Sequence, residues 1–179
     1  MKQLFQENEK INRILKLFFE NPTGSFHLRE IAHLTGVSPA TVSRKLKILV
    51  SSKFLKVVRS KPIFEVKANL DLREFVEAKK NHNIKVLIES GILDFLIQKY
   101  NHPEAIILYG GYAKGEDIEK SDVDIAIITS KKLAPPLEKF EKELKRRIHL
   151  LEINYDEIKP TLMNNLANGV ILFGYLKVK

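Results

Sequence analysis

The 179-residue sequence contains no cysteine. This absence excludes disulfide bonds, thiolate catalysis and cysteine-based zinc sites, so any metal must be held by oxygen or imidazole ligands. The sequence also lacks an apolar run approaching the roughly 20 residues that cross a bilayer. Its first residues, Met1 to Glu7, lack the apolar core of a signal peptide. We therefore expect a cytoplasmic protein with no membrane partner.

Acidic residues are scarce in the first third of the chain. Residues 1–67 contain 13 Lys and Arg against 5 Asp and Glu, whereas residues 68–179 contain 17 of each kind. The formal net charge of +8 is therefore confined to the N-terminal part. A solvated basic surface would explain some excess, but confinement to one small region is typical of a module that binds a polyanion.

The length permits one large domain or two small ones, because domains commonly contain about 100 to 150 residues. The composition is that of an ordinary globular protein, with 44% hydrophobic and 29% charged residues. We expect a DNA-binding domain at residues 1–67, a helical linker at 68–83 and a second domain at 84–179. The predicted fold class is α/β (α+β) with two domains.

Three helices are predicted in the first fifty residues. Apolar residues recur at helical spacing in residues 10–20 and 26–35, and Gly36 permits a tight turn after the second helix. Ser38 is a favourable N-cap and Pro39 a favourable first residue for the third helix. Its apolar stripe is expected at Val42, Leu46 and Leu49.

A β-hairpin is predicted to follow, with strands in residues 53–59 and 63–67. Residues 31–47 resemble the helix-turn-helix of winged bacterial and archaeal transcription regulators, and the resemblance extends over about residues 10–67. It implies that the third helix enters the major groove of double-stranded DNA and that the hairpin tip contacts phosphates or the minor groove. The residues expected to contact DNA are Ser38, Ala40, Thr41, Ser43, Arg44, Lys47, Arg59 and Lys61. A helix-turn-helix used only for protein contacts is the alternative.

The chemistry is concentrated in residues 108–129. The apolar run 105–109 predicts a strand that ends at Gly110 and Gly111, where bare backbone amides can approach an anion such as phosphate. Asp122 and Asp124 lie at the head of a second apolar run and one residue apart, so a strand would place both carboxylates on one face. Two neighbouring anions beside a buried strand need a counter-charge, and a divalent cation is the natural one.

This pattern resembles the nucleotidyltransferase superfamily of DNA polymerase β and the kanamycin nucleotidyltransferases, and especially its minimal members. The matching segments are Gly110-Gly111, Ala113-Lys114-Gly115 and Ser121-Asp122-Val123-Asp124, within about the last eighty residues. Gly111 replaces the serine that many members use. The resemblance implies a small mixed sheet, a nucleoside triphosphate (NTP) as substrate or ligand, and Mg²⁺ or Mn²⁺ held by Asp122 and Asp124. The expected nucleotide-binding residues are Gly110, Gly111, Lys114, Gly115 and Ser121.

A third carboxylate usually completes such a site from the neighbouring strand. Here the corresponding position is His149, and Glu152 is the only acid in the strand, on the opposite face by the two-residue period. If Glu152 or a substrate group completes the site, the protein is an enzyme that transfers a nucleoside monophosphate to a protein or small molecule, with Asp122, Asp124 and Glu152 as catalytic residues. Otherwise it is a transcriptional regulator that only senses nucleotide. An antitoxin-like component of a toxin–antitoxin pair remains a third reading.

The remaining C-terminal elements alternate between helix and strand, which indicates a sheet with helical cover. A long helix is expected at residues 84–100, interrupted only at Gly91, and an amphipathic segment at residues 69–80 leads to it through Asn81-His82-Asn83. Further helices are predicted at 136–147 and 156–168, and further strands at 148–153 and 170–176. We also expect a homodimer with residues 84–100 at its interface, because one winged domain offers few base contacts.

Overall fold

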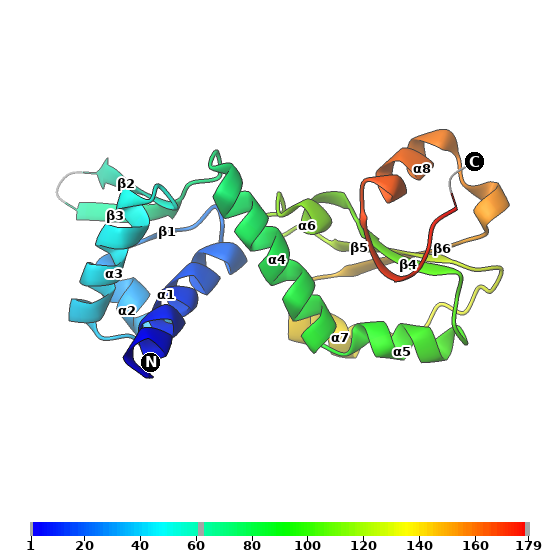
Figure 1. The fold of residues 1–179 in the computed structure, drawn as a ribbon, viewed down its shortest axis with the longest axis horizontal. Helices are drawn as coiled ribbons and strands as arrows, with labels where there is room; N and C mark the ends of the chain where they lie inside the picture. The colour runs from blue at the N-terminus through cyan, green and yellow to red at the C-terminus, as the bar shows by residue number, and fades with distance from the viewer. Residues whose placement is uncertain (1, 61–62, 178–179) are drawn as a thin grey trace. The chain divides into compact units, whose positions relative to one another are not determined.

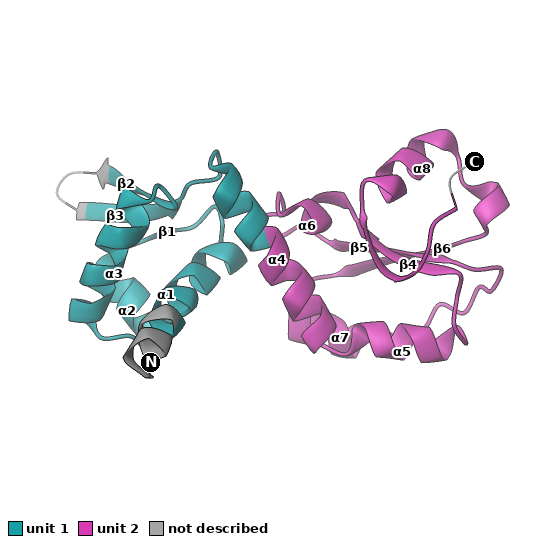
Figure 2. Cartoon of the chain, in the orientation of Figure 1, with its two compact units in different colours: residues 1–79 teal, residues 80–179 magenta. Residues whose placement is uncertain are grey.

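A computed structural model describes the backbone of residues 2–60 and 63–177 and the side chains of residues 9–58 and 64–177. The chain divides into two compact units, residues 1–79 (unit 1) and 80–179 (unit 2), coloured separately in Figure 2. This division falls within the predicted linker at residues 68–83. Within the described residues, no helix combines the length and apolarity needed to cross a membrane.

Unit 1 consists of three helices and a small antiparallel sheet. The helices are α1 (Lys2–Glu20), α2 (Leu28–Thr35) and α3 (Pro39–Ser51). The sheet has the order β1-β3-β2, from β1 (Ser25–Phe26), β2 (Leu55–Ser60) and β3 (Ile63–Ala68). The predicted stripe of α3 is buried and shares one core with α1, α2 and β2. The main members of that core are Ile14, Phe18, Ile31, Val42, Leu46, Leu49, Leu55 and Phe75.

Two local features of unit 1 differ from the sequence prediction. Phe26 is not helical, because it pairs with Val66 as part of the short strand β1. Ser38 does precede α3, but its hydroxyl donates to Thr41 Oγ1 at 3.0 Å and makes no capping bond to the backbone. Gly36 adopts φ 65° at the end of α2, which is the left-handed conformation that the tight turn requires.

Helix α4 (Arg73–Glu89) begins before residue 84, where the sequence predicts the start of the long helix. It continues through Asn81, His82 and Asn83 and ends before Gly91, which has φ 74° and precedes α5 (Ile92–Lys99). Asparagine and histidine weaken a helix only mildly, and Asn83 is buried with its amide hydrogen-bonded within unit 2. The helical segment therefore starts earlier than expected, and the interruption at Gly91 is confirmed.

Unit 2 is built on a four-stranded mixed sheet with the order β6-β5-β4-β7. Strand β4 (Ala105–Tyr109) pairs antiparallel with β5 (Val123–Ile128) and β7 (Val170–Gly174), and β5 pairs parallel with β6 (Ile148–Ile153). Helices α5 and α7 (Glu138–Leu144) lie on one face of the sheet, and α8 (Pro160–Ala167) lies on the other (Figure 1).

The two faces have separate apolar cores. Ile125 and Ile127 face the core beside α5 and α7, and Ala126 and Ile128 face the core beside α8. Strand β5 is thus buried on both sides, as its apolar run predicts. The last helix is shorter than expected, because residues 155–157 form a separate 3-10 turn and Pro160 occupies the first turn of α8. Proline suits that place because it lacks the backbone N–H.

Candidate functional site

The turn after β4 brings Gly110 against Asp124. Helix α6 (Gly110–Lys114) begins directly at the end of the strand, and Gly110 has φ 74°. A Cβ at Gly110 would lie 2.4 Å from Asp124 Oδ2. The backbone conformation therefore favours glycine at this position, and a larger residue would displace the Asp124 carboxylate. The first glycine of the motif is used for close approach to the carboxylate.

Asp124 is fixed between neighbouring strands. It lies opposite Tyr109 of β4 and opposite His149 of β6. The Nδ1 of His149 is 3.1 Å from Asp124 Oδ1, and the Asp124 side chain is 28% exposed while that of His149 is 61% exposed. Burial raises the pKa of the Tyr109 hydroxyl, and the charge of Asp124 raises it further. Asp122 is exposed and lies just before β5.

Glu152 is not brought together with Asp122 and Asp124. It lies opposite Ile127 in the register of β5 and β6, on the face covered by α5 and α7. Its carboxylate accepts hydrogen bonds from the Tyr100 hydroxyl and from the backbone amides of Leu133 at 2.6 Å and Ala134 at 3.0 Å. Partial burial acts to raise the pKa of Glu152, but these bonds and nearby Lys132 lower it overall. The same contact and burial raise the pKa of Tyr100.

The other expected nucleotide-binding residues lie in α6 and in the loop of residues 115–122. A Cβ at Gly111 would meet its nearest atom at 3.6 Å, so this position has room for a side chain. Lys114 is exposed, whereas Gly115 is buried with φ 76° at the end of α6. The Ser121 hydroxyl accepts a hydrogen bond from the amide of Ile118 at 3.0 Å, which folds the loop on itself.

Two family models match the chain. Residues 92–175 match the family described as polymerase beta, nucleotidyltransferase, and residues 9–59 match the IclR helix-turn-helix domain. No curated protein matches the chain significantly. The chain joins an IclR-type helix-turn-helix domain to a polymerase β nucleotidyltransferase domain. The resemblances read from both motifs are thereby confirmed.

The nucleotidyltransferase domain offers an incomplete set of metal ligands by itself. Among the residues that the structure describes, no group of three or more His, Asp or Glu side chains could hold a metal ion. Asp122 and Asp124 supply oxygen donors, which suit Mg²⁺ and Mn²⁺. The remaining ligands would have to come from water and from phosphate oxygens. These residues therefore fit a metal bound together with a triphosphate better than a metal bound alone.

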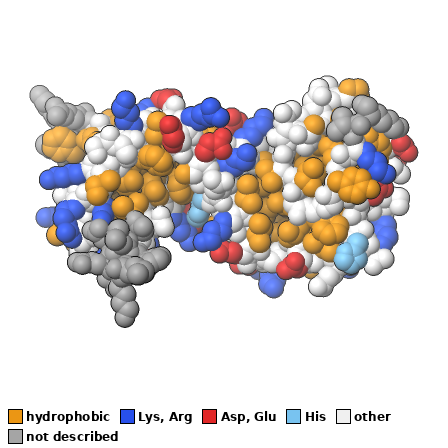
Figure 3. Space-filling model, in the orientation of Figure 1, with side chains coloured by type: hydrophobic (Ala, Val, Ile, Leu, Met, Phe, Trp, Pro, Cys, Tyr) orange, Lys and Arg blue, Asp and Glu red, His pale blue; other side chains and the backbone are white. Residues whose placement is uncertain are grey.

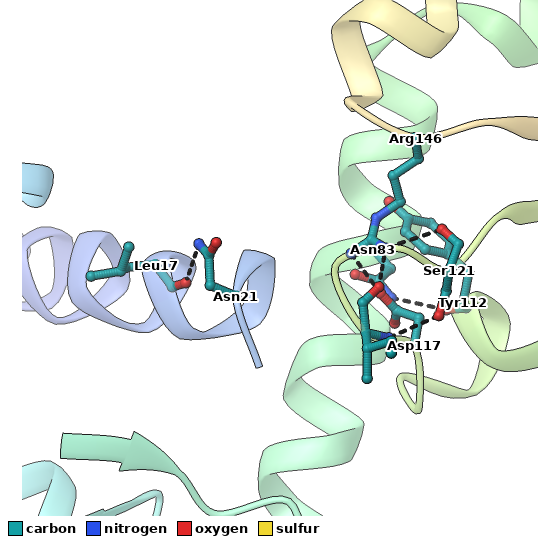
Figure 4. Close-up of polar contacts among 8 residues, drawn as sticks. Leu17, Asn21, Asn83, Tyr112, Asp117, Ser121 and Arg146 are labelled. Carbon is teal, nitrogen blue, oxygen red and sulfur yellow. Dashed lines mark hydrogen bonds and ion pairs between the residues drawn. The ribbon is translucent and has the colours of Figure 1, made fainter. Parts of the chain in front are cut away.

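A buried polar cluster in the nucleotidyltransferase domain was not predicted. Asp117 lies in the loop before Asp122, and its carboxylate contacts Asn83 of α4 and Arg146, which precedes β6 (Figure 4). The sequence offers no signal for this cluster, because its three members are far apart in the chain and polar residues in such places are usually solvated. Their burial is a property of the tertiary structure alone.

The surface of α3 carries four of the eight residues expected to bind DNA. Ala40, Arg44 and Lys47 are exposed, Ser38 is exposed just before the helix, and Ser43 is partly buried. Thr41 is buried and bonded to Ser38, so it does not belong to the exposed face. Lys and Arg side chains gather at the left edge of unit 1 in Figure 3, where α3 lies in Figure 1. Lys61 and the side chain of Arg59 lie outside the described residues.

Proposed function

We propose that the protein binds duplex DNA through its helix-turn-helix domain and transfers a nucleoside monophosphate from an NTP to a protein or small-molecule acceptor through its nucleotidyltransferase domain. One observation carries the second part. Asp124 is held between Gly110 and His149, beside the turn expected to meet the triphosphate, and the exposed Asp122 precedes the same strand two positions earlier.

In this proposal Asp122 and Asp124 hold Mg²⁺ or Mn²⁺ together with the triphosphate. When bound, the ion would neutralise phosphate charge and polarise the α-phosphorus. Gly110 keeps the space in front of Asp124 open, since any larger residue would collide with the carboxylate. The exposed imidazole of His149 lies beside Asp124 and can accept the proton of an acceptor hydroxyl.

A regulator that senses nucleotide without turnover is the second candidate, and a specific observation favours it. The acid of β6, Glu152, is engaged by Tyr100 and by two backbone amides on the other face of the sheet. The position beside Asp124 is filled by histidine, which carries no fixed negative charge at neutral pH. Binding needs only the two aspartates, whereas transfer also needs a group that activates the acceptor, a role that the enzyme has to give to His149 in place of a third carboxylate.

The DNA-binding part of the proposal rests on the exposed cations of α3. Arg44 and Lys47 are one turn apart on the helix and both are exposed. Cations so placed can displace the counterions condensed on duplex DNA, which makes affinity strongly dependent on salt. Residues 1–67 carry the whole positive excess of the chain, so this domain supplies the attraction.

A homodimer remains a prediction, with residues 84–100 as its proposed interface. Within residues 84–100, Leu87, Ile92, Leu96 and Tyr100 are buried in the core of unit 2. Ile88 is 49% exposed and is the large apolar residue that this segment leaves for self-association. Light scattering at micromolar concentration, with and without DNA, would show whether the protein is a dimer. A monomer under both conditions would remove the idea.

The deciding experiment is incubation of the full chain with Mg²⁺ and each of the four NTPs labelled at the α-phosphorus. Transfer of a nucleoside monophosphate leaves this label on the acceptor, whereas the same NTP labelled at the γ-phosphorus should leave none. Label on the protein or on an added acceptor, lost with Asp122→Asn and Asp124→Asn together, would support the enzyme. NTP binding without label transfer would instead support the sensor.

A further inference from the structure

The Asp117 cluster, defined as Asn83, Asp117 and Arg146, joins three separate stretches of unit 2. Asn83 lies in α4, Asp117 lies in the loop between α6 and β5, and Arg146 lies between α7 and β6. Figure 4 shows Asn83 and Arg146 converging on the Asp117 carboxylate. The cluster thus connects the loop of residues 115–122, here called the motif loop, to α4 and to the segment between α7 and β6.

Each member makes more than one polar contact. The Asn83 amide donates to Asp117 Oδ1 at 2.7 Å and to the carbonyl of Tyr112 in α6 at 3.0 Å. Arg146 Nη2 lies 2.9 Å from Asp117 Oδ2, and its Nη1 donates to the carbonyl of Ser121 at 3.1 Å and to that of Ile118. The guanidinium also lies over the Tyr112 ring, 5.7 Å from its centroid.

The ion pair of the cluster is removed from solvent. The side chain of Asp117 is 0% exposed and that of Arg146 is 9% exposed. Among the side chains that the structure describes, Asp117 is the one buried carboxylate. Burying two charges costs desolvation energy that their attraction offsets only in part, so such a pair is a weak source of net stability. The pair therefore holds nearby backbone in place and contributes little to the net stability of the fold.

The pair fixes the backbone before Asp122, and a main-chain hydrogen bond fixes the backbone after it. Arg146 holds the carbonyl of Ser121, which directly precedes Asp122. The next residue, Val123, donates its amide to the carbonyl of Arg147 at 2.8 Å. The Arg146 side chain thus anchors the residue before Asp122 and the Arg147 carbonyl anchors the residue after it, although the Asp122 side chain itself is exposed. Because its backbone is anchored, the exposed Asp122 carboxylate is presented to a ligand from a fixed position.

We propose that Asp117 and Arg146 are positioning residues that set the place of Asp122 for binding a metal–triphosphate complex. This inference rests on the proposed function of the nucleotidyltransferase domain. Groups that orient a ligand residue commonly change metal affinity by roughly 10- to 100-fold when they are removed. The cluster would act on affinity without touching the ligand.

The test compares two ways of changing the pair. Asp117→Leu together with Arg146→Met removes both charges, so it leaves no buried charge unpaired and should preserve folding. Arg146→Lys keeps a cation for Asp117 but loses the second donor arm that reaches Ser121. Both variants should bind the Mg²⁺ complexes of ATP, CTP, GTP or UTP roughly 10- to 100-fold more weakly than the unmutated protein in isothermal calorimetry.

Ser90→Ala is the matched control for loss of a buried polar group. The Ser90 hydroxyl is buried in unit 2 and donates to the carbonyl of Leu87 at 2.6 Å, away from the motif loop. This variant should lower the melting temperature and leave triphosphate affinity unchanged. Circular dichroism would confirm that every protein is folded at the temperature of the titration.

The outcomes separate the two proposals. If the unmutated protein binds a triphosphate and the folded double variant binds it equally well, the positioning role is wrong and the proposed function stands. If the unmutated protein binds none of the four triphosphates, both are wrong. Weaker binding by both cluster variants, with unchanged binding by Ser90→Ala, is the result that the positioning role predicts.

Discussion

The two units hold their functional charges in different ways. In unit 1, Arg44 and Lys47 are exposed on a helix whose opposite side supplies the core. In unit 2, Asp124 is confined between Gly110 and His149, and the loop before Asp122 is anchored by a buried ion pair. A polyanion is attracted by cations that need no fixed geometry, whereas a metal–triphosphate complex needs ligands at set positions. The comparison therefore predicts graded effects of mutation in unit 1 and sharp effects in unit 2.

The largest effect is expected from Gly110→Ala. The new Cβ would lie 2.4 Å from Asp124 Oδ2 on a backbone with φ 74°. We expect a loss of about 1–2 kcal/mol in the free energy of unfolding from left-handed strain, together with loss of triphosphate binding because the Asp124 carboxylate is displaced. Chemical denaturation measures it, with triphosphate binding recorded in parallel.

Gly111→Ala is its matched control. The added Cβ would be 3.6 Å from its nearest neighbour, and φ at Gly111 is not positive. Alanine favours a helix over glycine, so this change should be neutral or stabilise by up to about 1 kcal/mol. Equal effects of the two substitutions would contradict the geometry described for the β4–α6 turn.

The next effect tests unit 1. Arg44→Ala with Lys47→Ala should weaken duplex binding by about tenfold or more and reduce the slope of log affinity against log salt by about 2, because two phosphate contacts are lost. A gel-shift titration at several salt concentrations measures both quantities. Unchanged affinity would show that the positive charge of unit 1 is solvated surface. Melting should change little, since both side chains are exposed.

A smaller effect is expected from Glu152→Gln. The hydrogen bonds to Glu152 lower its pKa, so they stabilise the fold above the unfolded pKa of about 4.3 and lose that contribution as the pH falls through the lower folded value. The variant should lose roughly 0.5–1 kcal/mol of stability at neutral pH, because solvent screens the partly exposed carboxylate. The difference from the unmutated protein should shrink below about pH 4 in denaturation curves.

Glu152→Gln also tests whether a residue on the face of the sheet opposite Asp124 affects nucleotide binding or transfer. Because Glu152 lies on the face opposite Asp124, the variant should bind Mg²⁺ and a triphosphate as the unmutated protein does. Loss of label transfer with retained triphosphate binding would restore Glu152 as a catalytic carboxylate. It would then have to leave Tyr100 and its backbone partners during the reaction.

Much of the fold could be predicted from local signals. The stripe of Val42, Leu46 and Leu49 has helical spacing. The apolar run 105–109 is followed by a left-handed turn position that suits glycine. The site was partly predictable for the same reason, since strand alternation places Glu152 away from Asp124 and His149 beside it. The Asp117 cluster could not be predicted, because Asn83 and Arg146 reach Asp117 only after folding. The joining of the predicted linker and long helix into α4 was not predicted, because the polar residues 81–83 give no sign of the burial of Asn83.

The most direct test of the account is a melting experiment on the unmutated protein and on Asp122→Asn with Asp124→Asn. Mg²⁺ with at least one NTP should raise the melting temperature of the unmutated protein, because a ligand that binds only the folded state stabilises it by about 2.7 kcal/mol at 100 times its dissociation constant. Mg²⁺ alone should raise it less. The double variant should lose the increment and retain DNA binding. If no combination of metal and triphosphate shifts the unmutated protein, the role proposed for Asp122 and Asp124 is contradicted.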